Sequence, residues 1–164
     1  MKVITNFFKN NYKKIIAIVL AIIFVSVLGS FFENNNYSEK INIENIKYIK
    51  IAGQKIKVDI ALSSEVQERG LSGRTSLKED EGMLFIFKKP SIYRFWMKEM
   101  NFPIDMIWIS EDLRVVYIKK NATPESYPET FTSTKDAKYV LEVFGLFSEK
   151  NNLREGDKVE FLSS

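Results

Sequence analysis

The chain has 164 residues, of which 45% are hydrophobic and 27% are charged, a composition typical of one ordinary globular domain. It contains neither cysteine nor histidine, which excludes disulfides, thiol nucleophiles, the commonest zinc sites and any histidine-based triad or general base. An oxygen-ligand metal site and a mechanism based on Lys, Asp or Glu stay open on these grounds. No motif requires a metal or a cofactor, and we expect neither.

The net charge of +3 belongs to the beginning of the chain. Residues 1–40 contain five lysines and two glutamates, and so carry the whole excess. The other 124 residues contain 19 basic and 19 acidic side chains. Because that part has no positive excess, we expect no nucleic-acid binding.

Residues 15–32 read IIAIVLAIIFVSVLGSFF and contain no charged side chain. A helix rises 1.5 Å per residue, so this stretch would span ~27 Å, close to the thickness of a hydrocarbon core of about 30 Å. A buried helix of a globular protein rarely lacks a polar face over such a length. The segment therefore predicts a single transmembrane anchor.

Lysines before this segment predict its orientation. Lys2, Lys9, Lys13 and Lys14 precede it and Glu33 follows it, so the positive-inside rule places residues 1–14 in the cytoplasm and the rest outside. A cleaved signal peptide, followed by secretion, is the alternative, because 27–29 offers small residues at suitable offsets. The polar residues 33–45 predict a flexible linker before a domain at 46–164.

The first elements of that domain have local signals. Residues 55–60 alternate strictly between polar and apolar, which predicts a half-buried strand, and 48–51 lies just before it as the other strand of a hairpin. A capping box at 64–67 predicts a short helix that ends near Gly70 or Gly73.

Short apolar runs then follow one another, separated by turn signals: 82–87, 93–97, 104–109 and 113–118. Residues 104–109 predict a central strand, 119–138 a long polar connection, and 139–144 and 158–161 the last strands, with helix-like residues 147–153 between them. The pattern predicts a mainly β fold, β-rich α+β: a compact antiparallel or mixed, barrel-like sheet with one or two short helices.

Trp96 is the first candidate for ligand binding. In a strand, Arg94, Trp96 and Lys98 share one face, and this places a Trp between two cations. Such a face suits a ligand with a flat or anionic part. Alternatively, Trp96 belongs to the core and the two cations extend to water.

Two carboxylates lie in apolar strands, Asp105 and Glu142. A buried carboxylate needs a partner, so Asp105 predicts either an acid/base or ligand-anchoring group, or a salt bridge or turn cap. If both point into one cavity, they could act as a carboxylate pair. Arg69 and Arg74 flank a Gly-rich turn and could hold an anion, or could pin the helix end to the sheet.

Six blocks together resemble the DUF192 (UPF0127) family, from about Ile56 to Phe161 and in the family's order. The blocks are Glu68-Arg69-Gly70-Leu71 with Arg74, Gly82 to Phe87, Phe95 to Lys98, Pro103 to Ile107, Tyr139 to Val143, and Gly156 to Val159. The resemblance implies a compact β-rich domain, often behind an anchor or signal peptide, and supplies no function. The motif residues it implies are Arg69, Arg74, Met83, Trp96, Met97, Lys98, Pro103, Asp105, Glu142 and Asp157.

These observations lead to three hypotheses. The first is a membrane-anchored extracytoplasmic domain that binds a small molecule, glycan or peptide, with ligand-binding candidates Arg69, Arg74, Trp96, Lys98, Asp105 and Glu142. The second is a small enzyme that acts on a saccharide-like substrate with Lys98, Asp105 and Glu142. The third is a structural role in the cell envelope, which predicts an exposed apolar patch and no concave pocket.

Overall fold

A computed structural model describes residues 16, 18–20 and 43–163 of the chain. Residues 16 and 18–20 are helical, but most of the predicted membrane segment and linker lies outside the described residues. Within the described ranges, the helices are too short or too polar for a bilayer span. The residues from Ile43 onward belong to one compact unit, Asn42–Ser164.

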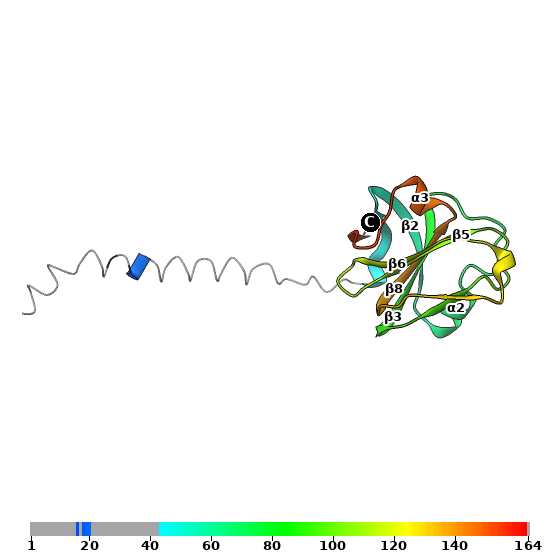
Figure 1. Cartoon of the computed structure of the whole chain (residues 1–164), viewed down its shortest axis with the longest axis horizontal. Helices are drawn as coiled ribbons and strands as arrows, with labels where there is room; N and C mark the ends of the chain where they lie inside the picture. The colour runs from blue at the N-terminus through cyan, green and yellow to red at the C-terminus, as the bar shows by residue number, and fades with distance from the viewer. Residues whose placement is uncertain (1–15, 17, 21–42, 164) are drawn as a thin grey trace, which may run out of the picture. The chain divides into compact units, whose positions relative to one another are not determined.

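Residues 43–163 form nine strands and four short helical segments (Figure 1). In chain order they are η2 (Ile43–Asn45), β1 (Ile46–Ile51), β2 (Gln54–Ala61), α2 (Ser64–Arg69), β3 (Glu81–Ser91), β4 (Arg94–Trp96), β5 (Ile104–Ile109), β6 (Val115–Ala122), η3 (Pro124–Ser126), β7 (Thr130–Thr132), β8 (Ala137–Phe144), α3 (Phe147–Lys150) and β9 (Val159–Ser163). The expectation of a mainly β fold with a few short helices is confirmed.

Seven strands form one mixed sheet in the order β6-β5-β8-β3-β2-β1-β9, and β4 pairs with β7 in a separate ribbon. The β2–β3 pair is parallel and the other pairs are antiparallel. The sheet is not closed, so the barrel-like expectation is wrong. The residues just before its edge strands β6 and β9 form one isolated bridge, between Arg114 and Lys158, while β6 itself pairs with β5 alone among the described strands.

Two other expectations are also corrected. The predicted central strand, β5, is buried throughout but is second from the edge of the sheet, because it is followed by the half-buried edge strand β6. The middle strand of the sheet is β3. The predicted connection 119–138 contains the end of β6, η3 and β7. Its polar residues belong to edge and ribbon strands, which have one face in water and therefore resemble loops in composition.

Local signals worked best in the first third of the domain. The β1–β2 hairpin is confirmed, and its turn residues Ala52 and Gly53 both have positive φ, as a two-residue hairpin turn requires. The helix α2 begins one residue earlier than the capping box suggested: the Ser63 hydroxyl accepts a hydrogen bond from the Val66 N–H at 3.3 Å. It ends at Gly70, where φ is 52°.

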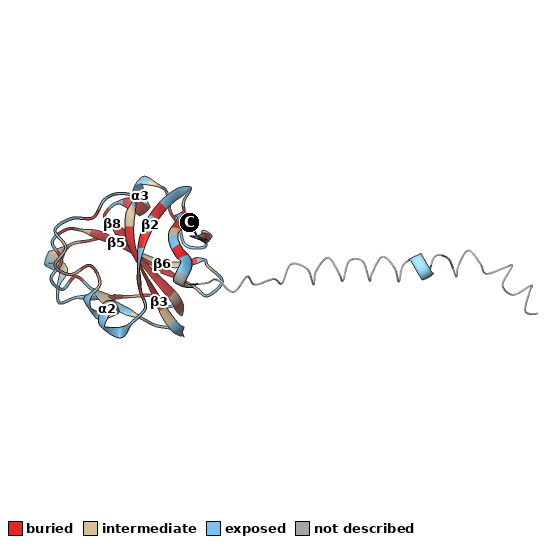
Figure 2. Cartoon of the chain, turned by 180° about the vertical axis from the view of Figure 1, so that it is seen from behind, coloured by how far each residue is buried: buried red, intermediate tan, exposed pale blue. Residues whose placement is uncertain are grey.

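The main sheet carries a hydrophobic cluster on each face. One cluster includes Leu84, Ile107 and Leu141 and is completed by residues of β1, β9 and α3. The other includes Phe85 and Trp108 and is covered by α2, the β4–β7 ribbon and the loops between them. In Figure 2 the buried colour accordingly runs along the main strands, and α2 is largely exposed.

Candidate functional site

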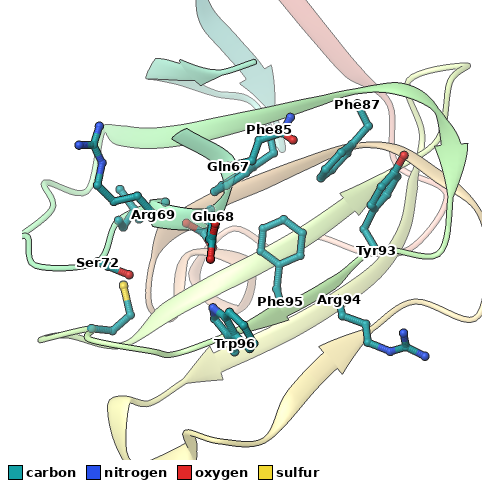
Figure 3. A pocket seen from close by; sticks show the side chains of 14 residues that line it. Gln67, Glu68, Arg69, Ser72, Phe85, Phe87, Tyr93, Arg94, Phe95 and Trp96 are labelled. Atoms are coloured by element: carbon teal, nitrogen blue, oxygen red, sulfur yellow. The ribbon is translucent and has the colours of Figure 1, made fainter. Parts of the chain in front are cut away.

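An aromatic cavity of about 220 Å³ lies on the second face of the sheet, between α2, β3 and β4 (Figure 3). Its lining combines five aromatic side chains with a few polar groups. The lining residues are Gln67, Glu68, Arg69, Gly70, Leu71, Ser72, Phe85, Phe87, Tyr93, Arg94, Phe95, Trp96, Met100 and Glu142. We call this space the aromatic cavity.

The wall formed by α2 is held to the sheet through one side chain. The Gln67 amide donates two hydrogen bonds. One goes to the carbonyl of Ala61, the last residue of β2, at 3.1 Å, and the other to the carbonyl of Ile86, within β3, at 2.9 Å. The loop after α2 is tied to the loop after β4, since the Ser72 hydroxyl donates to the Lys98 carbonyl at 2.7 Å. Both walls are therefore positioned by hydrogen bonds between elements far apart in sequence.

The aromatic wall is built from alternate residues of two strands. Phe85 and Phe87 share a face of β3, and Phe95 projects toward them from β4. The Phe95 ring is almost perpendicular to both, at 88° and 4.8 Å between centroids for Phe85 and at 85° and 6.4 Å for Phe87. Edge-to-face contacts of this kind add to the burial energy and hold the rings in defined orientations.

Tyr93 closes one end of the aromatic cavity. Its ring stacks on Phe87, and its carbonyl accepts hydrogen bonds from the Trp108 indole, at 3.0 Å, and the Thr132 hydroxyl, at 3.1 Å. At the other side of β4, Trp96 is 44% exposed and meets Tyr127 edge to face. The rim therefore has one anchored aromatic side chain and one that is accessible to solvent.

Glu142 supplies a buried carboxyl group to this aromatic cavity. Register places it between Met83 on β3 and Met106 on β5, and only 5% of it is exposed. Its Oε2 has no hydrogen-bond partner among the described residues. Burial raises the pKa of Glu142 from 4.5 to about 8, although the positive charge of Arg74 acts in the opposite direction. At neutral pH this carboxyl group is therefore mostly protonated.

The structure brings together three of the six predicted site residues: Arg69, Trp96 and Glu142 line the aromatic cavity. In Figure 3 the Arg69 guanidinium points away from the aromatic rings. Arg74 instead forms an ion pair with Asp59 at 2.8 Å, and Lys98 is exposed and outside the lining. β4 ends at Trp96, so Lys98 does not continue the predicted face, and Phe95 lines the cavity together with Arg94 and Trp96.

Asp105 lies on the opposite face of the sheet. It pairs in register with Val143, whereas Met106 pairs with Glu142, and neighbouring residues of a strand point to opposite faces. Its carboxylate accepts three backbone N–H hydrogen bonds, from Asn121 at 2.8 Å, Leu146 at 3.0 Å and Ser148 at 2.7 Å. Asp105 therefore caps the start of α3, and the proposed pair with Glu142 does not form.

The sequence interpretation missed most of the aromatic wall. Phe85, Phe87, Tyr93 and Phe95 were assigned to strands and core, and Gln67 was not considered. A usable signal was present, because aromatic residues at every second position in two successive strands indicate one continuous aromatic face. Within the described residues, no cluster of three or more acidic side chains is arranged to hold a metal ion.

The fold and site thus define a small domain with an open mixed sheet and an aromatic cavity under a short helix. The sequence model of the DUF192 family, described as "Uncharacterized ACR", matches residues 47–161, and the chain belongs to this family. The resemblance noted from the sequence is confirmed.

Two crystal structures are similar over the domain. A protein of unknown function from Novosphingobium aromaticivorans is 32% identical, with a TM-score of 0.66 over 70% of this chain and 84% of that one. A protein from Sinorhizobium meliloti, described as a "putative transcription regulator", is 29% identical, with a TM-score of 0.65 over 70% of this chain and 90% of that one. No curated protein matches the chain.

Proposed function

We propose that this DUF192 domain is a binding module that takes a small organic ligand into the aromatic cavity. The observation that carries the proposal is a concave site with five aromatic side chains and a buried carboxyl oxygen that lacks a partner. Sites of this composition are the usual form of small-molecule pockets, in which apolar walls give affinity and a few polar groups fix orientation. At about 220 Å³ the cavity suits a ligand or ligand group of few atoms.

The proposal can be tested on the full-length chain in detergent, with methionine methyl groups labelled with ¹³C. Met100 lines the aromatic cavity, while Met97 is buried outside the lining. In a screen of small sugars, amines, carboxylates and aromatic fragments, a true ligand should move the Met100 methyl signal more than that of Met97. A complete screen without a saturable Met100 shift would count against the binding function.

A variant pair localises any binding that the screen detects. Trp96→Ala removes an exposed ring of the lining, so affinity should fall by about tenfold, which corresponds to about 1.4 kcal/mol. Tyr48→Ala removes a partly exposed ring on β1, outside the lining, and should leave affinity unchanged. Equal losses in the two variants would place the binding site elsewhere.

We further propose that the domain acts outside the cytoplasm and is tethered by residues 15–32. The apolar segment and the lysines before it support this placement. Alkaline phosphatase fused to the C-terminus should be active, and it should lose activity when Lys2, Lys9, Lys13 and Lys14 are replaced by Glu. The intact mass of the membrane-extracted protein distinguishes a retained anchor from a cleaved signal peptide. Activity of the reporter only in the cytosol would overturn the placement.

The alternatives from the sequence have less support. The saccharide-cleaving arrangement needs Lys98, Asp105 and Glu142 in one site, and register separates the two carboxylates. A purely structural role predicts a surface without a concave pocket. The name of the Sinorhizobium meliloti relative does not carry over, because residues 41–164 contain equal numbers of basic and acidic side chains.

A further inference from the structure

We propose that the aromatic cavity binds an organic ammonium group, enclosed by the rings of Phe85, Phe95 and Trp96 and neutralised by the Glu142 carboxylate. This inference rests on the proposed ligand-binding function and names the chemical class of the ligand.

The rings of the aromatic cavity offer faces suited to an organic cation. Organic cations bind over aromatic ring faces within about 6 Å of the centroid, and groups of rings recognise quaternary ammonium ions in this way. Phe95 stands nearly perpendicular to Phe85 and Phe87, so the rings form walls in different directions instead of one flat stack. Trp96 adds an indole at the rim, which is open to an entering ligand.

Glu142 brings a buried carboxyl oxygen to the same cavity. Glu142 is almost fully buried, lines the aromatic cavity and has an Oε2 without a hydrogen-bond partner among the described residues. Gly70, the residue that follows α2, has no side chain to cover this oxygen, and a Cβ there would lie 3.8 Å from it. A buried carboxylate is stable only when it is paired, and a bound cation would supply the pair.

The protein's own cations do not take that place. Arg74 is paired with Asp59, the Lys119 ammonium lies 4.3 Å from the centre of the Phe131 ring, and in Figure 3 the Arg69 and Arg94 guanidiniums point away from the rings. The titratable or charged groups around Glu142, from the elements packed against it, are Asp59, Glu68, Arg69, Arg74, Tyr93, Arg94 and Lys119. The one further acidic group of the lining, Glu68, would also favour a cation.

A neutral ligand that accepts a hydrogen bond from protonated Glu142 is the competing possibility, and pH separates the two. Because the pKa of Glu142 in the unliganded protein is about 8, an ammonium ligand must displace a proton from it below that pH. Its affinity should therefore rise about tenfold per pH unit up to about pH 8 and then level off. A neutral acceptor needs the proton, so its affinity should be constant below pH 8 and fall above it.

The experiment compares charged and neutral ligands of the same shape on the full-length chain. Choline and its carbon analogue 3,3-dimethylbutan-1-ol form one pair, and n-butylammonium and butan-1-ol form the other. Dissociation constants are measured between pH 6 and 9 from the Met100 methyl shift. We expect both cations to bind at least tenfold more tightly than their analogues at pH 8, and about fiftyfold more tightly at pH 8 than at pH 6, since about half of Glu142 is still protonated at pH 8.

Two variants connect this behaviour to Glu142. Glu142→Gln should weaken choline binding at pH 8 by at least tenfold and abolish its pH dependence. Glu149→Gln changes an exposed carboxylate on α3 and should behave like the wild type. Thermal unfolding of each variant checks that it is folded.

The outcomes separate this inference from the function on which it rests. Neutral analogues that bind as tightly as the cations, or cation binding that is independent of pH, would overturn the ammonium assignment and leave a ligand-binding cavity. Failure of both cations, with another fragment shifting Met100, would do the same. Failure of every compound at Met100 would overturn both proposals.

Discussion

Glu142 and Asp105 show how differently two buried carboxyl groups are accommodated on one sheet. Asp105 has three backbone N–H donors, which satisfy a negative charge. Glu142 is surrounded by methionine and aromatic side chains, and burial raises its pKa above the ordinary value of a glutamate, so it keeps its proton to a higher pH than an exposed glutamate. Asp105 therefore holds the start of α3 through its hydrogen bonds, while Glu142 reduces stability when it ionises.

The pH dependence of stability should reveal Glu142. The folded state holds its proton up to about pH 8, whereas the unfolded state releases it near 4.5. The stabilisation that Glu142 contributes by holding its proton is therefore fully present below pH 4.5 and is lost progressively up to about pH 8. It amounts to on the order of 5 kcal/mol at most, at about 1.4 kcal/mol per pKa unit. We expect urea unfolding to show that the wild type loses free energy of unfolding relative to Glu142→Gln as the pH rises across this window.

Glu149→Gln is the control for that measurement, since it removes an exposed carboxylate. Its unfolding free energy should follow that of the wild type at every pH. A wild-type minus Glu142→Gln difference that stays constant between pH 5 and 8 would show that Glu142 titrates normally.

Asp105→Asn tests the cap on α3. The amide has one acceptor oxygen in place of two and brings an NH₂ group close to backbone N–H groups. Because hydrogen bonds to a charged group contribute about 1.5–3 kcal/mol each, we expect a loss of at least about 3 kcal/mol in urea unfolding. Asp80→Asn, at an exposed position, should change stability by less than about 0.5 kcal/mol. Equal stability of the two variants would contradict the capping role.

At the scale of elements, the cavity depends on how α2 ends. Gly70 has φ 52° and ψ −132°, and its position turns the chain over Phe85 and Glu142. A Cβ there would lie 3.3 Å from the Phe85 ring. Glycine at this site therefore permits both the backbone conformation and the close approach of the helix end to the aromatic wall.

Gly70→Ala and Gly73→Ala form a matched pair. Both residues have positive φ, but a Cβ at Gly73 would have no neighbour within 4 Å. Both variants should lose about 1 kcal/mol or more from backbone strain. Gly70→Ala should lose more and should also shift the ¹³C signals of the Phe85 ring. Equal losses with no change at Phe85 would show that the contact is unimportant.

The ribbon β4–β7 is the element that the sequence described least well. Its strands have three residues each, and buried Phe131 and partly buried Phe95 pack against the core. Such short strands have too few residues to show a period. Their arrangement depends on partners far away in the chain, such as Trp108, whose indole holds the Tyr93 carbonyl.

At the scale of the whole molecule, the open sheet predicts a gradient of stability. β3 and β8 are hydrogen-bonded on both sides in the middle of the sheet, and β6 and β9 form its edges. In native-state hydrogen exchange, amides of β3 and β8 should exchange only through global unfolding, and those of β6 and β9 through smaller openings. Equal protection of edge and centre would indicate that the contact between Arg114 and Lys158 extends into a closed arrangement in solution.

By itself, the sequence determined the family, the mainly β composition, the β1–β2 hairpin and the short capped helix, because each depends on neighbouring residues or on a linear pattern. Only the tertiary structure decided that the sheet stays open, that Asp105 and Glu142 face opposite sides, and that aromatic residues of β3 and β4 enclose a cavity. The physical reason is register. Alternation shows which residues of one strand share a face, but the pairing of β5 with β8 joins residues 30 to 40 positions apart, and a shift by one residue would reverse every face.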